Sequence, residues 1–170
     1  MSVPAHHEHK AHAPRHIGCM VITCSDTRAP DTDTSGKLIV HLLKEQGHTV
    51  AAYHLVKDEP AQIRVRIEEA VKNEAIQAII INGGTGISRR DSTFEAVDAL
   101  LEKRLDGFGE VFRALTYQEI GSPAIMTRAT AGTYKGRIIF STPGSENAVK
   151  LAMEKLILPE LGHILQQLGT

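Results

Sequence analysis

The sequence is poor in aromatic residues and has no excess of either charge. It contains no tryptophan, four phenylalanines and three tyrosines, which is too few rings for a surface that stacks successive bases. Its formal net charge of −1 gives no general attraction to nucleic acid or to anionic lipid. We therefore expect neither a nucleic-acid partner nor a membrane partner.

Long apolar runs and paired cysteines are also lacking. No apolar stretch reaches the roughly 20 residues that a membrane-spanning helix needs, and residues 1–16 lack the apolar core of a signal peptide. Cys19 and Cys24 lie in one predicted strand, five positions apart, so they point to opposite faces and cannot pair with each other. Because free thiols are typical of a reducing compartment, the sequence predicts a cytoplasmic protein.

Length and apolar content predict one folded domain preceded by a polar tail. A chain of 170 residues, 42% of them hydrophobic, has the usual size of a single domain and can form a substantial core. Residues 1–16 show no hydrophobic period, so we expect a disordered tail there and one domain over residues 17–170. A transition-metal site is the alternative for the tail, although its histidines have no fixed ligand spacing. These histidines are His6, His7, His9, His12 and His16.

Strands and helices alternate over the first 100 residues. Nearly uniform apolar runs predict strands at Ile17–Cys24, His48–Val56 and Ile79–Ile81. The β-α-β-α-β-α order predicts an α/β fold with a parallel sheet, right-handed crossovers and helices on both faces. The helices are predicted from apolar stripes at helical spacing, namely Leu38, Ile39, Leu42 and Leu43, then Ile63, Ile67, Ala70 and Val71, then Phe94, Val97, Leu100 and Leu101.

The rest of the chain predicts a hairpin and further helices. Strands at Arg128–Tyr134 and Arg137–Ser141 are expected to pair across a short glycine turn. One helix is expected to follow residues 106–113 and to stop before Gly121. In the C-terminal helical pattern, Pro159 is expected to interrupt the helix before a final apolar stripe.

Three loops are expected to meet at one edge of the sheet. Ligands of parallel α/β sheets bind beyond the carboxyl ends of the strands. Ser25 and Asp26 follow the first predicted strand, Asp58 follows the second, and the loop over residues 83–91 follows the third. The sequence therefore places one candidate site at this edge.

The Gly83-Gly84-Thr85-Gly86 turn is the centre of that candidate site. It has neither the G-x-G-x-x-G spacing of a dinucleotide fingerprint nor the Gly-Lys-Ser/Thr of a Walker A loop. Glycines permit positive φ, so backbone N–H groups can turn toward an anion at the positive end of the following helix. With Arg90 and Asp91 close by, the turn is typical of a phosphate site, and a purely structural turn is the alternative. Asp91 or Ser92 is expected to cap the next helix.

Two carboxylates at this edge are candidates for a shared cation site. Asp58 and Asp91 repel each other unless a proton or cation lies between them, and beside phosphates that cation is usually Mg²⁺. The alternative is that each aspartate merely caps its own helix, which stabilises that helix by about 1 kcal/mol. Thr142-Pro143-Gly144-Ser145 forms a second small-residue turn at a helix start, which suits a phosphate, a polar ring edge or a plain loop.

These motifs, taken in order, resemble the molybdopterin-binding family. The similar segments are Gly83–Gly86 with Arg90, Asp91 and Thr93, then Asp33-Thr34-Ser35-Gly36, and Pro143-Gly144-Ser145. Three further segments resemble the MoaB branch of that family, namely Gly107–Arg113, Glu119-Ile120-Gly121 and Arg128–Gly132. The similarity covers about residues 16–165.

The resemblance implies a fold and a chemistry. The fold is a three-layer α/β/α sandwich with a mostly parallel sheet and a small β-hairpin, assembled as homotrimers or hexamers. The ligand is molybdopterin, a pterin dithiolene with a terminal phosphate. Active relatives adenylylate that phosphate with Mg-ATP and release pyrophosphate. Their essential carboxylates correspond by motif to Asp58 and Asp91, which would hold the Mg²⁺.

The remaining residues carried over by motif are assigned to substrate or nucleotide binding. They are Ser25, Asp26, Ser35, Gly83, Gly84, Thr85, Gly86, Arg90, Pro143, Gly144 and Ser145. The retention of both aspartates favours the enzyme. The alternatives are a non-catalytic molybdopterin carrier of the same pathway and, from another class, an assembly module like the related domain of larger scaffold proteins.

Overall fold

The computed structural model describes residues 14 and 16–169. Its strands are β1 (Gly18–Cys24), β2 (Thr49–Val56), β3 (Ala78–Asn82), β4 (Lys103–Arg104), β5 (Thr130–Tyr134) and β6 (Arg137–Thr142). Its α-helices are α2 (Thr34–Glu45), α3 (Pro60–Lys72), α4 (Thr93–Asp98), α5 (Asp106–Ile120), α6 (Glu146–Ala152) and α7 (Leu158–Leu168). A 3₁₀ helix, η1 (Ser122–Met126), and a π-helical turn, η2 (Met153–Ile157), complete the elements. The predicted tail lies outside the described residues except for Pro14 and His16.

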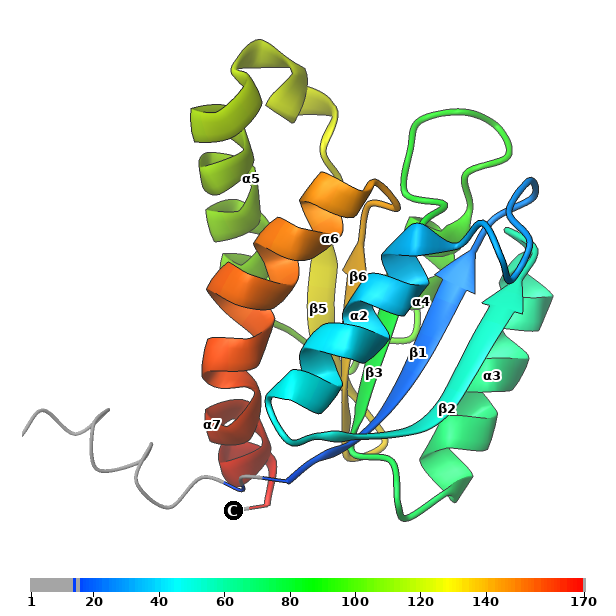
Figure 1. Cartoon of the computed structure of the whole chain (residues 1–170), viewed down its shortest axis with the longest axis vertical. Coiled ribbons are helices and arrows are strands. Elements are labelled where there is room, and N and C mark those ends of the chain that lie inside the picture. The colour runs from blue at the N-terminus through cyan, green and yellow to red at the C-terminus, as the bar shows by residue number, and fades with distance from the viewer. Residues whose placement is uncertain (1–13, 15, 170) are drawn as a thin grey trace, which may run out of the picture.

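The strands of the described chain form one six-stranded sheet in the order β2-β1-β3-β6-β5-β4. β1 pairs in parallel with β2 and β3, and β3 pairs in parallel with β6. β5 runs antiparallel to both of its neighbours, so it forms the predicted hairpin with β6. The carboxyl ends of β1, β2, β3 and β6 therefore meet at one edge, where the loops described below gather (Figure 1).

Two hydrophobic cores cover the two faces of this sheet. On one face, buried side chains of α2, α5, α6 and α7 pack against the sheet, and on the other face those of α3 and α4 do so (Figure 1). Cys19 belongs to the first core and Cys24 to the second, as their spacing in β1 predicts, and both thiols are free and buried. Burial raises the pKa of each thiol to about 12. The predicted three-layer α/β/α fold with a mostly parallel sheet is confirmed.

Two predictions of helix boundaries are wrong. α5 already begins at Asp106, within the stretch that was expected to precede it. Gly109 lies inside this helix, where a Cβ would come within 2.7 Å of the Ala129 carbonyl oxygen. The close packing of α5 against this segment therefore requires a residue without a side chain. Pro159 does not interrupt its helix, because the wider π-helical turn η2 precedes it and accommodates a residue that lacks an N–H group.

Candidate functional site

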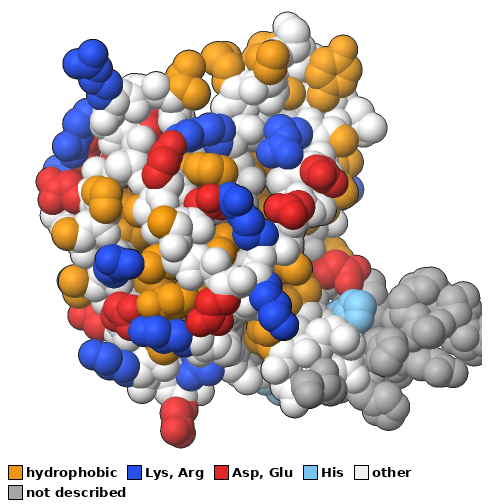
Figure 2. Space-filling view, turned by 180° about the vertical axis from the view of Figure 1, so that it is seen from behind, with side chains coloured by type: hydrophobic (Ala, Val, Ile, Leu, Met, Phe, Trp, Pro, Cys, Tyr) orange, Lys and Arg blue, Asp and Glu red, His pale blue; other side chains and the backbone are white. Residues whose placement is uncertain are grey.

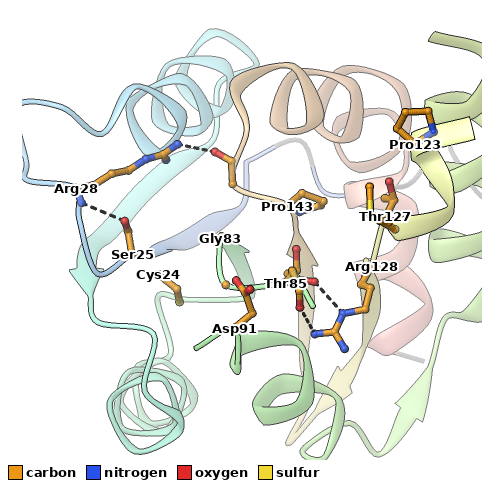
Figure 3. Close-up of a pocket in the computed structure, with 14 residues that line it drawn as sticks. Cys24, Ser25, Arg28, Gly83, Thr85, Asp91, Pro123, Thr127, Arg128 and Pro143 are labelled. Carbon is orange, nitrogen blue, oxygen red and sulfur yellow. Dashed lines mark hydrogen bonds between the residues drawn. The ribbon is translucent and has the colours of Figure 1, made fainter. Parts of the chain in front are cut away.

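A cavity of about 370 Å³ opens at the predicted edge of the sheet (Figure 3). Loops after β1, β3 and β6 form it together with η1 and the segment that leads into β5. It is lined by Cys24, Ser25, Arg28, Gly83, Gly84, Thr85, Gly86, Asp91, Pro123, Met126, Thr127, Arg128, Pro143 and Gly144.

The glycine turn forms the floor of the cavity, and its backbone admits no larger residues. Gly83 and Gly84 have φ values of 95° and 61°, in the region that favours glycine. A Cβ on Gly83 would lie 2.2 Å from the Cys24 carbonyl oxygen. One on Gly84 would lie 2.2 Å from both the Asp58 Oδ2 and the Thr93 Oγ1. The turn is therefore packed tightly between the end of β1 and the start of α4.

Asp58 holds this turn in place from the neighbouring loop. It is 6% exposed, and its Oδ1 accepts hydrogen bonds from the Ser92 N–H (3.1 Å), the Ser92 Oγ (2.9 Å) and the Thr93 Oγ1 (3.0 Å). Neither Asp91 nor Ser92 caps α4 with its own side chain, which corrects that prediction. Asp58 does not cap its own helix α3 either, because Glu59 is the N-cap residue there and makes no side-chain cap. The start of α4 is instead held by a carboxylate from another loop.

Asp91 is the carboxylate that faces the cavity. Its Oδ2 accepts a hydrogen bond from the Ser88 N–H at 3.0 Å, and a Cβ on Gly86 would lie 2.7 Å from the same oxygen. Hydrogen bonding from Ser88, with the Gly86 amide and the positive charge of Arg128, keeps the pKa of the Asp91 carboxyl below its usual value. Asp91 is therefore ionised at neutral pH.

Arg90 is paired away from the cavity. Its Nε and Nη2 donate to the two carboxylate oxygens of Asp26 at 2.8 and 2.9 Å. The hydrogen bonds from Arg90 lower the pKa of the Asp26 carboxyl, and neither residue lines the cavity. The pair ties the loop after β1 to the loop after β3, so Arg90 is occupied by a structural ion pair.

Arg128 holds the other side of the glycine turn. Its Nε donates to the Thr85 carbonyl (2.8 Å) and its Nη2 to the Gly86 carbonyl (2.7 Å), while both of its terminal nitrogens reach the carboxylate of Glu95. The guanidinium also lies over the Phe94 ring, 4.7 Å from its centroid. Arg128 thus fixes the conformation of the turn from the strand side (Figure 3).

The loop after β1 contributes a second arginine through a buried network. Asp33 is fully buried, and its carboxylate accepts from the Arg28 Nη1 (3.1 Å), the Gly36 amide (3.0 Å) and the Tyr53 hydroxyl. Burial alone would raise the pKa of the Asp33 carboxyl, but hydrogen bonds from Thr23, Tyr53 and Gly36, with the charge of Arg28, hold it below its usual value.

The turn at the start of α6 closes the cavity on the side of Arg28. The Gly144 carbonyl accepts from the Arg28 Nη2 and from the Ser35 Oγ, both at 2.7 Å. Gly144 packs on the glycine turn, because a Cβ there would lie 3.0 Å from the Gly83 Cα. The Ser145 Oγ accepts from the Ala148 amide at 3.3 Å and so caps α6. Ser35 and Ser145 therefore shape this wall without lining it.

The structure brings together most of the residues that the sequence assigned to the site. Eight of them line the cavity, namely Ser25, Gly83, Gly84, Thr85, Gly86, Asp91, Pro143 and Gly144. Five lie outside the lining and support it or pair elsewhere, namely Asp26, Ser35, Asp58, Arg90 and Ser145.

The sequence prediction missed the two arginines of the cavity. Arg28 lies two residues after Asp26, and Arg128 opens the segment Arg128–Gly132, which resembles the family but indicates no role for this arginine. An arginine at the carboxyl end of a strand is a signal for anion binding that could have identified Arg28. No local signal pointed to Arg128, because its carbonyl partners Thr85 and Gly86 are more than 40 positions away in the sequence.

The fold and the cavity define a class of protein that the comparisons identify. Residues 20–163 match the family model described as "probable molybdopterin binding domain". The chain therefore belongs to the molybdopterin-binding domain family, and the resemblance seen in its motifs is confirmed.

Individual relatives fall in the predicted branch of this family. The chain is 52% identical over 162 residues to molybdenum cofactor biosynthesis protein B of Bacillus subtilis, covering 95% of each protein. It superimposes with a TM-score of 0.89 on a crystal structure of a molybdenum cofactor biosynthesis protein B, at 50% identity, covering 92% of this chain and 98% of the other. It also superimposes on a crystal structure of the tungsten cofactor synthesizing protein MoaB from Pyrococcus furiosus, with a TM-score of 0.85 and 41% identity. This match covers 93% of this chain and 100% of the other.

The donor groups at the cavity suit a phosphate ligand with a hard cation. Mg²⁺ prefers carboxylate and phosphate oxygens, and Asp91 presents a carboxylate to the cavity. Asp58 uses Oδ1 for the start of α4, which leaves Oδ2, the oxygen nearest to Gly84, for a cation.

Among the residues that the structure describes, no helix is long and apolar enough to span a membrane.

Proposed function

We propose that this protein acts in molybdenum cofactor biosynthesis, where it binds molybdopterin and adenylylates its terminal phosphate with ATP. The proposal rests on the cavity at the sheet edge, in which a glycine turn with positive φ is enclosed by Asp91, Asp58 and two arginines. Membership of the molybdopterin-binding domain family and the names of the relatives support the ligand and the pathway.

The glycine turn would bind one phosphate group. Within the described chain, the amides of Gly84 and Thr85 donate to no protein acceptor, so they are available to an anion in the cavity. The fixed positions of these amides favour binding, because Arg128 and Asp58 already hold the turn. The turn therefore loses little conformational entropy when it binds an anion.

In the proposed reaction, an oxygen of the molybdopterin phosphate attacks the α-phosphorus of ATP. A new P–O bond forms, the bond between the α-phosphorus and the bridging oxygen breaks, and pyrophosphate leaves with that electron pair. The attacking phosphate is already anionic, so alignment and charge neutralisation matter more than a general base. Mg²⁺ bound to Asp91 and Asp58 would supply part of that neutralisation.

A non-catalytic molybdopterin carrier of the same pathway is the second candidate. It shares the cavity and the phosphate site, and it differs only in consuming no nucleotide. The ionised state of Asp91 favours the enzyme, because a charged carboxylate that lines the cavity repels a bound phosphate unless a cation lies between them. We further propose that the protein is a homo-oligomer, a trimer or a hexamer.

The test is a direct assay of adenylyl transfer. Purified protein is incubated with molybdopterin and Mg-ATP, and adenylylated pterin and pyrophosphate are quantified. The enzyme hypothesis predicts both products, their loss in Asp91→Ala, and retained molybdopterin binding in that variant. Tight molybdopterin binding by the wild-type protein without nucleotide consumption would establish the carrier instead.

A further inference from the structure

Arg28 has a position in the cavity that its protein contacts do not fully use. Its Nη1 donates to Asp33 and its Nη2 to the Gly144 carbonyl, so these bonds engage two of the five N–H groups of a guanidinium. The side chain lines the cavity and is 27% exposed. Three N–H groups of this cavity-lining guanidinium therefore donate to no acceptor within the described chain.

Arg128, the other arginine that lines the cavity, and Arg90, in the loop after β3, are more fully engaged than Arg28. Arg128 donates to two carbonyls and, through both terminal nitrogens, to Glu95. Arg90 donates to both oxygens of Asp26 and does not line the cavity. In Figure 3, Arg28 and Arg128 lie on opposite sides of the cavity, with Thr85 and Asp91 between them. Of the two arginines that line the cavity, Arg28 is thus the one with N–H donors to spare, opposite the one that holds the turn.

The guanidinium of Arg28 is held in this position by a network that joins three neighbouring strands of the sheet. Tyr53 of β2 and the Gly36 amide of α2 bond to the fully buried Asp33, which in turn fixes Arg28. Thr23 of β1 bonds to the same carboxylate and accepts from the Asn82 side chain of β3 at 2.9 Å. A preorganised fork of N–H donors is the arrangement that recognises phosphate oxygens.

We infer that Arg28 directly binds a phosphate group of the ligand, separate from the group at the glycine turn, and that Asp33 and Tyr53 are its positioning residues. The inference rests on the proposed function only in taking the ligand to carry phosphate groups. That phosphate belongs either to the nucleotide or to the pterin, and the binding measurements distinguish the two sources.

The first experiment measures binding of inorganic pyrophosphate, ATP, AMP and molybdopterin by calorimetry, at several salt concentrations. We expect Arg28→Gln to weaken pyrophosphate binding about 10-fold or more, with an intermediate loss in Arg28→Lys. The dependence of affinity on salt should become shallower in Arg28→Gln, because one ion pair is lost. Weakened binding of ATP and pyrophosphate with AMP unchanged assigns Arg28 to the β- and γ-phosphates, whereas weakened binding of molybdopterin alone assigns it to the pterin phosphate.

Matched variants separate ligand contact from positioning and from folding. Arg64→Gln, on the exposed surface of α3, should leave all affinities within about two-fold. Tyr53→Phe should weaken pyrophosphate binding by about three-fold without changing its salt dependence, since the charge of Arg28 remains. Far-UV circular dichroism checks the fold, and Arg28→Lys retains the charge if Arg28→Gln fails to fold.

The result that overturns the inference is unchanged affinity for pyrophosphate, ATP and molybdopterin in folded Arg28→Gln and Arg28→Lys. Failure of the proposed function looks different. If pyrophosphate binding depends on Arg28 but the wild-type protein transfers no adenylyl group, the inference stands and the enzyme hypothesis falls. If Arg28→Gln transfers adenylyl groups with wild-type kcat and wild-type KM for both substrates, the enzyme hypothesis stands and the inference about Arg28 falls.

Discussion

Asp58 and Asp91 follow different strands and have different roles at the loop after β3. Asp58 is buried and bonded to the residues that start α4, whereas Asp91 faces the cavity and is held by the Ser88 amide. The sequence placed both at this edge from strand order alone. It could not divide their roles, because the partners of Asp58 at Ser92 and Thr93 lie 34 and 35 positions away.

Gly84 tests the packing of the glycine turn. Gly84→Ala would place a Cβ 2.2 Å from the Asp58 carboxylate at a φ of 61°, so we expect a loss of about 2–4 kcal/mol in the free energy of unfolding. Gly136→Ala is the control, since it shares a positive φ of 74° but has no atom within 4 Å of the new Cβ. Equal losses in urea unfolding of the two variants would show that steric contact with Asp58 is absent.

Asp33 makes stability depend on pH. Its carboxyl has a pKa below the unfolded value of about 3.9, so its contribution is present above that pH and is lost as the pH falls through the folded pKa. Asp33→Asn should cost about 1–3 kcal/mol at pH 7 and flatten the fall in stability between about pH 5 and pH 2. Chemical unfolding at a series of pH values measures both effects, and a profile parallel to that of the wild type would contradict this role.

At the scale of elements, prediction succeeded where an apolar pattern repeats. β1, β2 and β3 and the helices between them follow from apolar runs and stripes, and Asp33 is the N-cap residue of α2, which begins at Thr34. The two-residue β4 and the 3₁₀ helix η1 are too short to produce such a pattern. η1 still matters for the site, since it contributes Pro123 and Met126 to the cavity.

Ser145 tests whether a predicted ligand residue acts through the helix it caps. Its Oγ accepts from the Ala148 amide, so Ser145→Ala should cost about 1 kcal/mol and lower the melting temperature by about 2–4 °C. Ser145→Asp should retain the cap and the stability. If Ser145→Ala instead loses affinity for molybdopterin at unchanged melting temperature, the side chain binds the ligand and the structural role is wrong.

At the scale of the whole molecule, exposed apolar side chains gather at one end. Tyr117, Ile120, Ile125 and Met126, on α5 and η1, are 55–87% exposed, and Figure 2 shows hydrophobic side chains clustered at this upper end. Clusters of exposed apolar side chains usually mark an interface. The proposed homo-oligomer gives this surface, which lies beside the cavity at Met126, a partner.

We expect the wild-type protein to sediment as a trimer or hexamer in analytical ultracentrifugation. Ile120→Asp or Ile125→Asp should shift it toward monomer, because a charge would be buried in the interface. Val65→Asp, at a 52% exposed apolar position on α3, is the control and should leave the assembly unchanged. A monomeric wild-type protein, or unchanged assembly in both α5–η1 variants, would exclude this interface.

The central claim is that Asp91 and Asp58 bring a divalent cation to phosphate groups held at the glycine turn. The most direct measurement replaces Mg²⁺ by paramagnetic Mn²⁺ and records the ³¹P resonances of protein-bound ATP. We predict broadening of these resonances in the wild-type protein, and in Asp91→Asn an affinity for Mn²⁺ in the bound complex that is lower by about 10-fold or more. Affinity equal to that of the wild type in a folded Asp91→Asn variant would contradict the account.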